Sequence, residues 1–184
     1  EESEGLDLKL WNERLENAKM HLDEGEFSLA RGVSDGIVRE VRKEREAMGE
    51  VQRALRQKKK LKERWKGRAD SDEWEERLKN VTDASKRKSW SHAGALLERL
   101  AADLDTLDAA SGDAEELLTY VQNEWTALRK KLEGRGIKAI DGERAACEKA
   151  VGDAKAAFEE GRLEETLNAL GEADGLMEKL RRRV

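Results

Sequence analysis

The side chains that could carry out catalysis or bind a metal are few and widely separated in this sequence. Two histidines, His21 and His92, and one cysteine, Cys147, occur among 184 residues. Neither histidine has a glutamate three residues before it, so the helical Glu-x-x-His pattern of iron-binding bundles is absent. No sequence feature places a base beside Cys147 to activate it as a nucleophile. We therefore expect no catalytic residue and no metal ligand, with both histidines as exposed caps or rim residues and the cysteine in the core.

Loops that bind calcium or phosphate are not indicated either. The closely spaced acidic pairs, Asp70 with Asp72 and Asp103 with Asp105, lack the glycine and the twelfth-position glutamate of a calcium loop. The glycines are dispersed and follow no strand, so a glycine-rich phosphate loop is not expected. We predict no cofactor and a protein that is not an enzyme.

The composition is typical of long helices or coiled coils. Charged residues make up 42% of the chain, hydrophobic residues 38%, and proline is absent. A net charge of -5 is too small to indicate a partner. One cysteine excludes an intrachain disulfide, and no apolar run approaches the roughly 20 residues of a membrane span. Because the chain begins with Glu1, we expect a fragment or a processed form, cytoplasmic by default.

Apolar residues recur at alternating intervals of three and four, which is the seam of a coiled coil. This period predicts helices over residues 6–23, 26–66, 71–86, 89–133, 138–159 and 163–184. Gly112 does not change the phase, so 89–133 is expected to be one helix. The predicted fold is all-α, an elongated array of antiparallel helical hairpins or staggered three-helix bundles with coiled-coil-like seams.

Large aromatic side chains fall on this seam. Each buries a large apolar area, which a thin bundle needs. The predicted seam anchors are Trp11, Phe27, Trp65, Trp74, Trp90, Trp125 and Phe158.

The pattern repeats along the chain. A shift of 63 residues takes Trp11 to Trp74, and a shift of 136 takes Gly25 to Gly161. Since 63 residues are nine heptads, the seam stays in register between the first two copies. We predict three hairpin repeats of a short helix, a turn and a longer helix: residues 1–69, 70–136 and a truncated 137–184.

The turns resemble tetratricopeptide hairpins in their small and aromatic packing residues. These are Ala18, Gly25, Phe27 and Ala30, and again Ala154, Gly161 and Leu163. The closing proline of that family is absent and the second helices exceed a 34-residue unit, so the resemblance does not extend to a peptide-binding superhelix. The long linking helices are similar in plan to spectrin repeats, whose last helix the segment QNEWTAL at residues 122–128 resembles. This plan implies staggered three-helix bundles.

A basic strip near the end of the second predicted helix contains one acid, Glu63. We define the basic strip as Arg53, Arg56, Lys59, Lys60, Arg64, Lys66 and Arg68. It could bind phosphates, with Trp65 available for stacking on bases. The preferred interpretation is a solvated helix face that acids at residues 72–76 neutralise through weak ion pairs.

Together these features predict a non-enzymatic structural protein. We expect a scaffold or protein–protein interaction module built of helical repeats, self-assembling or part of a larger coiled-coil protein. The alternative is a binder of nucleic acid or an anionic surface through residues 53–68. The expected partner is a protein, including a second copy of this chain, since the first hairpin lacks a third helix. Nucleic acid is the less favoured partner.

Overall fold

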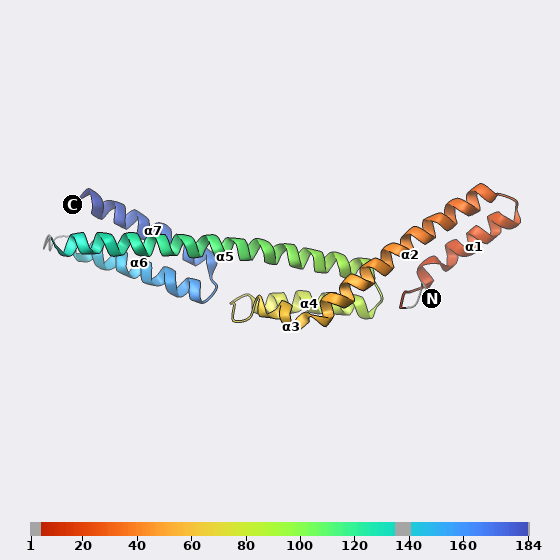
Figure 1. Cartoon of the computed structure of the whole chain (residues 1–184), viewed down its shortest axis with the longest axis horizontal. Helices are drawn as coiled ribbons and strands as arrows, with labels where there is room; N and C mark the ends of the chain where they lie inside the picture. Colours follow the sequence, from red (N-terminus) through yellow and green to blue (C-terminus); the bar gives the residue numbers. More distant parts are fainter. Residues whose placement is uncertain (1–4, 135–140, 184) are drawn as a thin grey trace. The chain divides into compact units, whose positions relative to one another are not determined.

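The structure, a computed structural model, describes residues 5–134 and 141–183. This part of the chain forms α-helices and no strand, so the expected all-α fold is confirmed. The helices are α1 (Lys9–Asp23), α2 (Phe27–Arg56), α3 (Lys58–Glu63), α4 (Ser71–Lys86), α5 (Trp90–Glu133), α6 (Asp141–Glu159) and α7 (Leu163–Arg182) (Figure 1). Within the described residues, no helix combines the length and the apolar character that crossing a membrane requires.

The longest helix, α5, runs without interruption through 44 residues. Its seam keeps the alternating spacing on both sides of Gly112, with Leu104, Ala114 and Leu118 all buried. A glycine inside a helix costs roughly 0.5–1 kcal/mol relative to alanine. The buried residues on either side outweigh that cost, so the prediction of one helix over residues 89–133 is confirmed.

The single helix predicted over residues 26–66 is wrong, because the helix is interrupted at Gln57. A straight continuation would keep Lys58 and Lys62 on the apolar seam. After the interruption, Lys62 pairs with Glu75, and Trp65 is buried with 1% of its surface exposed. Burial of the indole and solvation of the lysines therefore favour the break over a continuous helix.

Three turns of the chain are built alike. Each contains one residue with positive φ, namely Gly25 at 80°, Lys88 at 57° and Gly161 at 73°. The backbone N–H of the next residue then bonds back to a carbonyl in the last turn of the preceding helix, as in a Schellman motif. These bonds join Glu26 to His21 at 2.8 Å, Ser89 to Ala84 at 3.0 Å and Arg162 to Ala157 at 2.9 Å.

The chain divides into two compact units. Unit 1 comprises Glu1–Trp65 and Asp72–Ala102, and unit 2 comprises Lys66–Ser71 and Asp103–Val184. These boundaries differ from those of the three predicted repeats, and the division of the sequence into three repeats stays a prediction.

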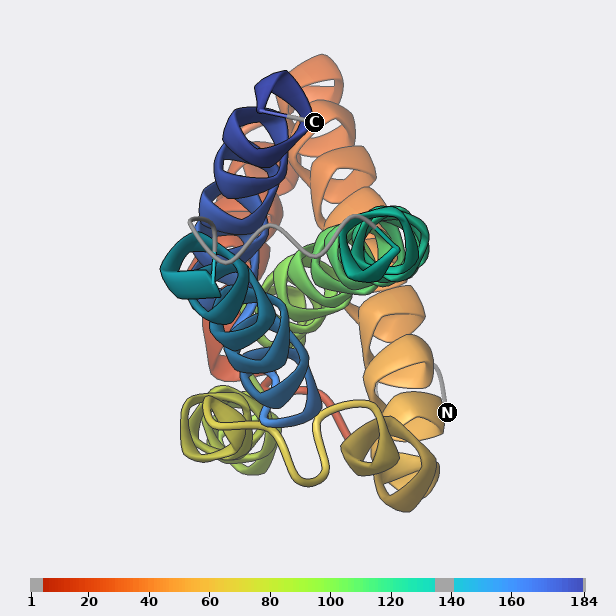
Figure 2. The same ribbon diagram turned by 90° about the vertical axis from the view of Figure 1, so that its left-hand side faces the viewer.

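Unit 2 contains a three-helix bundle. The α6–α7 hairpin lies against the C-terminal part of α5, as Figures 1 and 2 both show. All three helices contribute to one hydrophobic core, made by Leu118, Val121, Trp125, Leu128, Leu132, Cys147, Ala150, Val151, Ala154, Leu170, Ala173, Met177 and Leu180.

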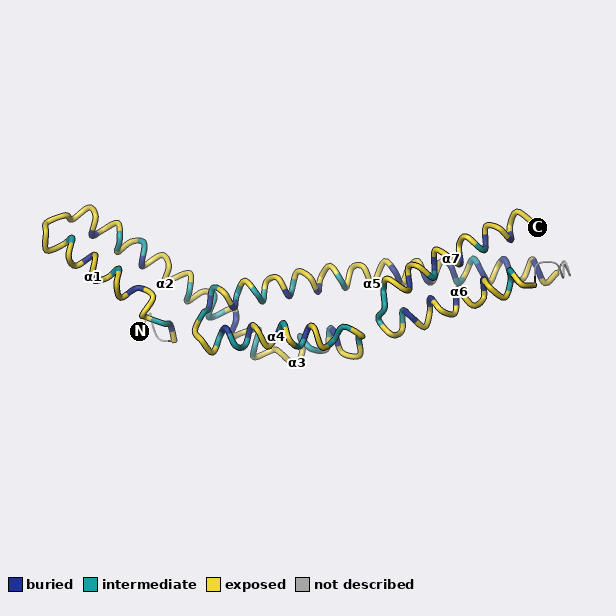
Figure 3. Tube along the Cα trace, turned by 180° about the vertical axis from the view of Figure 1, so that it is seen from behind, coloured by how far each residue is buried: buried dark blue, intermediate teal, exposed yellow. Residues whose placement is uncertain are grey.

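Unit 1 has a core of its own. It combines residues of α1, α2, α4 and the start of α5 with Leu6 before the first helix. The buried members are Leu6, Trp11, Ile37, Val51, Val81, Ala84, Trp90 and Ala93. In Figure 3 the far end of the α1–α2 hairpin is mostly exposed, so the core lies away from that tip.

A candidate cationic groove in the first hairpin

Charged side chains of α1 and α2 surround a stripe of small residues in unit 1. On α2, Gly32, Gly36, Glu40 and Lys43 recur at intervals of four and three residues, which places them on one helix face. Arg14 reaches the same face from α1. With Val33 and Arg39, these residues line an open groove of about 480 Å³, which we call the cationic groove.

Gly36 makes room for a guanidinium group in the cationic groove. A Cβ atom at this position would lie 3.1 Å from Nη2 of Arg14. A larger residue would therefore displace the Arg14 side chain. A Cβ atom at Gly32 would meet no atom within 4 Å, so this part of the groove floor is open.

Glu40 is the carboxylate of the cationic groove. The indole N–H of Trp11 donates to Oε2 of Glu40 at 3.1 Å, and Nη1 of Arg14 donates to the same oxygen at 2.6 Å. These hydrogen bonds, that of Trp11 first, lower the pKa of Glu40 below its ordinary value. The side chain is therefore ionised at neutral pH, and it holds Arg14 at the edge of the groove.

The remaining cations, Arg39 and Lys43, are exposed on α2. Among the residues that the structure describes, neither side chain forms an ion pair within 4.0 Å, although the charge of Arg39 contributes to lowering the pKa of Glu40. Three cations and one carboxylate give the lining an excess of positive charge. Such a groove can bind a small molecule with two anionic groups, while Glu40 offers a partner for an ammonium group.

A second groove of unit 1, of about 460 Å³, is more apolar. Leu55 and Trp90 form its walls, and Gln52, Arg56 and Ser85 add polar groups. The hydroxyl of Ser85 already donates to the carbonyl of Thr82 at 2.7 Å. This groove therefore offers fewer charged partners than the cationic groove does.

The residues of the basic strip are divided between the two units. Arg53 and Arg56 bond back to carbonyls of α2, from Nε to Gly49 and to Gln52, at 3.3 Å each. Lys59 and Lys60 are exposed on α3. These two lysines and Arg64 belong to unit 1, whereas Lys66 and Arg68 belong to unit 2. Nucleic acid as a partner of this strip stays a prediction.

The proposed availability of Trp65 for base stacking is wrong. Its ring stacks on Trp74 with centroids 6.3 Å apart, and its N–H donates to Oε1 of Glu75 at 3.1 Å. Lys62 pairs with the same glutamate, and Nε of Arg68 lies 2.9 Å from Oδ1 of Asp70. Acids that follow the strip in the sequence thus pair with lysine and arginine side chains of this region.

Six of the seven seam anchors contribute to packing. The five tryptophans are buried, with 1% to 8% of each residue exposed, and Phe158 packs partly buried against the core of unit 2. These tryptophans are Trp11, Trp65, Trp74, Trp90 and Trp125.

The prediction is wrong for Phe27, which is 67% exposed. Trp90 holds the corresponding place at the start of α5 and is covered by the core of unit 1, where its N–H donates to the carbonyl of Gly5 at 3.0 Å. Phe27 is the first residue of α2, at the tip of the α1–α2 hairpin, and its exposure shows that no described element of unit 1 covers it. Phe27 does continue the three-four spacing of the seam, but no described helix of unit 1 covers the seam at this residue.

Cys147 and His92 lie where the sequence predicts. Cys147 is fully buried, and burial, with a smaller contribution from Glu148, raises the pKa of its thiol to about 11. A thiol with so high a pKa is a poor nucleophile at neutral pH. His92 is exposed.

Sequence reasoning missed two groups of side chains. One is the cationic groove, for which the spacing of Gly32, Gly36, Glu40 and Lys43 was the available signal. The other joins His21 to Glu24 and Glu26 across the first turn. No spacing rule indicates this second group, because the end of a helix separates the histidine from the glutamates.

Comparison with known proteins adds one finding. The family model of glutamate-cysteine ligase family 2 (GCS2) matches residues 82–184, which is more than half of the chain. The matched segment runs from the end of α4 through α5, α6 and α7. Neither the curated proteins nor the solved structures gave a match to the chain.

This match contradicts the expected function. The family is one of ligases, so the predictions of a non-enzymatic scaffold, a structural protein or a protein–protein interaction module are wrong, and so is the exclusion of an enzyme. Neither that function nor its alternative, a binder of nucleic acid or an anionic surface, included a ligase. The exclusion rested on missing nucleophiles, metal ligands and phosphate loops, whereas binding amino acids needs only well-placed charges.

Proposed function

Because the chain belongs to glutamate-cysteine ligase family 2, we propose that it takes part in joining glutamate to cysteine through an amide bond. The observation that carries this proposal is the match over residues 82–184. The cationic groove of unit 1 also supports this proposal, because its charges suit the binding of an amino-acid substrate.

Amide formation sets the chemical requirements. The cysteine amine attacks an activated carboxyl carbon of glutamate, the activating group leaves, and the nitrogen loses a proton. A free carboxylate does not react in this way in water, so a phosphoryl donor such as a nucleoside triphosphate must activate it. The described residues contain no strand followed by a glycine-rich loop. We therefore assign amino-acid binding to this chain and derive no phosphoryl-transfer step from it.

The charges of the cationic groove complement those of glutamate. At neutral pH glutamate carries two carboxylates and one ammonium group. Arg39 and Lys43 can bind the carboxylates, since guanidinium and ammonium groups form charge-assisted hydrogen bonds with them. The ionised Glu40 can accept from the substrate ammonium group. Arg14, which Glu40 positions, adds a third cation at the edge of the groove.

Substrate binding is tested by titrating the chain with L-glutamate in isothermal calorimetry. We expect Arg39→Ala to weaken the affinity by about tenfold or more, because a hydrogen bond to a charged group contributes roughly 1.5–3 kcal/mol. Arg42→Ala is the matched control, since Arg42 is also exposed on α2 but does not line the groove. Glutamine should bind more weakly than glutamate because it lacks one carboxylate.

Equal affinities of the two arginine variants would remove the groove as the glutamate site. Catalysis is tested separately by mass spectrometry of reactions that contain the chain, glutamate, cysteine, ATP and Mg²⁺. Amide product and released phosphate should form in equal amounts. Product no greater than in the reaction without protein would contradict the proposed function.

A further inference from the structure

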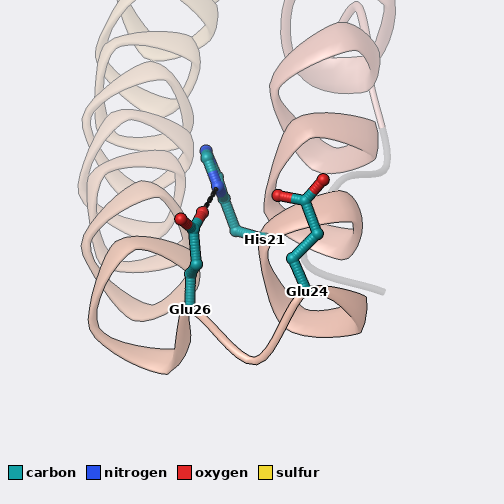
Figure 4. A group of neighbouring side chains, drawn as sticks. All are labelled: His21, Glu24 and Glu26. Carbon is teal, nitrogen blue, oxygen red and sulfur yellow. Dashed lines mark hydrogen bonds and ion pairs between the residues drawn. The ribbon is translucent and has the colours of Figure 1, made fainter.

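The turn between α1 and α2 brings three metal-ligating side chains together. His21 lies in the last turn of α1, Glu24 directly follows α1, and Glu26 directly precedes α2. Each offers one ligand atom, and these atoms all lie within 4.8 Å of one another. Figure 4 shows the imidazole ring between the two carboxylates. In the part of the chain that the structure describes, no other group of three or more such side chains meets this criterion.

Local contacts hold two of the three ligand residues, His21 and Glu26, close together. Nδ1 of His21 lies 2.6 Å from Oε2 of Glu26, and the backbone N–H of Glu26 donates to the carbonyl of His21 at 2.8 Å. Gly25, with φ of 80°, reverses the chain between them. Two of the three ligand residues are therefore joined through both backbone and side chain.

The ligands are not needed to form the turn. The turns at Lys88 and Gly161 close through the same backbone bonds but carry different side chains at the corresponding positions. Those positions hold Ala84, Arg87 and Ser89 in one turn, and Ala157, Glu160 and Arg162 in the other. Turn formation thus explains Gly25, but it does not explain a histidine and two glutamates that converge.

We propose that His21, Glu24 and Glu26 bind a divalent transition-metal ion, for which Zn²⁺ is the best match. Imidazole nitrogen and carboxylate oxygen are ligands that zinc accepts, at about 2.0–2.2 Å. Two donors of one ion then lie at most about 4.4 Å apart, so small rotations of the exposed glutamates bring all three within reach. Three protein ligands leave the fourth tetrahedral position to water.

Binding of the ion should also stabilise the first hairpin. The three ligands come from the end of one helix and the start of the next, so they meet only when the turn is formed. An ion that binds the folded turn and not the unfolded chain raises the free energy of unfolding. Zinc should therefore raise the melting temperature of the wild-type chain.

The site is tested by calorimetric titration of the full chain with ZnCl2. We expect one ion per chain, and at least tenfold weaker binding in His21→Ala. His92→Ala is the matched control, because His92 is the other histidine, is exposed and lies away from this turn. Glu26→Gln should also weaken binding, whereas Glu16→Gln, an exposed glutamate of α1 paired with Lys19, should not.

Two further readouts separate binding from misfolding. Circular dichroism should show unchanged helicity in every variant, since the substituted side chains are at the surface or partly exposed. In ¹⁵N-histidine spectra, zinc should shift the ring signals of His21 and leave those of His92 unchanged. The proposal is overturned if the wild-type chain binds no zinc at millimolar concentration, or if His21→Ala binds it as tightly as wild type.

Discussion

Trp11 and Trp65 are buried, and each donates its indole N–H to a glutamate at 3.1 Å. The acceptors, Glu40 and Glu75, are also bonded to a cation, Arg14 in one case and Lys62 in the other. A buried indole needs such a partner for its N–H. Each glutamate therefore links a buried tryptophan of the apolar seam to a cation at the surface. In both cases these hydrogen bonds lower the pKa of the glutamate.

Glu75 should make stability depend on pH. The hydrogen bond from Lys62 and then that from Trp65 lower its pKa in the folded chain. Its contribution is therefore complete above the unfolded pKa and is lost as the pH falls through the folded pKa. We expect Glu75→Gln to flatten the fall in the free energy of unfolding between about pH 5 and pH 3, measured by urea denaturation. Identical slopes in Glu75→Gln and the exposed control Glu73→Gln would contradict this.

At the scale of elements, the three turns use one backbone design with different residues. Glycine adopts positive φ without strain, whereas a side chain with a Cβ atom is disfavoured there. Gly25 and Gly161 fit this rule, and Lys88, with φ of 57°, does not. The turn at Lys88 forms nevertheless, because it lies between α4 and α5, whose residues Ala84 and Trp90 are held in the core of unit 1.

Exchanging residue types at these turns should change stability in opposite directions. Lys88→Gly removes the strain and should raise the free energy of unfolding by about 0.5–1 kcal/mol. Gly25→Ala introduces backbone strain and should lower the free energy of unfolding by about 1 kcal/mol. A steric clash adds nothing to this loss, because no atom lies within 4 Å of the added Cβ. Thermal denaturation followed by circular dichroism measures both. A loss of stability in Lys88→Gly would show that the lysine has a contact that outweighs its backbone strain.

Across the whole molecule, the hairpins differ in what covers them. Within unit 2, the α6–α7 hairpin packs against α5, and within unit 1 the start of α5 shares a core with α2 and α4. At the tip of the α1–α2 hairpin, Leu15, Leu22 and Phe27 are 42%, 53% and 67% exposed. They flank a groove of about 320 Å³ whose lining includes Ala18 and Ala30. The sequence predicts a second copy of the chain as a partner, and this apolar face is the surface that we expect that copy to cover.

Sedimentation velocity over a concentration series tests this partner. We expect a dimer that dissociates on dilution, because apolar faces of two hairpins can cover each other about a twofold axis. Phe27→Glu should abolish association by placing a charge on the face. Leu167→Glu is the matched control, since Leu167 is similarly exposed at 49% but lies on α7. A monomer at every wild-type concentration would exclude the second copy as the partner.

The sequence alone determined the features that depend on local spacing. The alternation of three and four residues predicted the all-α fold, the continuity of α5 and the burial of Trp11, Trp74 and Trp125, because a helix converts spacing directly into a face. Glycines at the ends of that pattern predicted two of the turns for the same reason. The ligase family was not accessible from spacing, since the alternation of three and four residues specifies helix faces and not a reaction.

The tertiary structure decided which parts of the seam are covered and which charges meet. It broke the predicted helix at Gln57, buried Trp65 against Trp74, and left Phe27 exposed. It also brought Arg14 over Gly36, and His21 beside Glu26. Each of these outcomes depends on contacts between residues of different elements or, for Phe27, on the absence of such contacts. A helical period specifies a face, but only the packing of a second helix determines what that face touches.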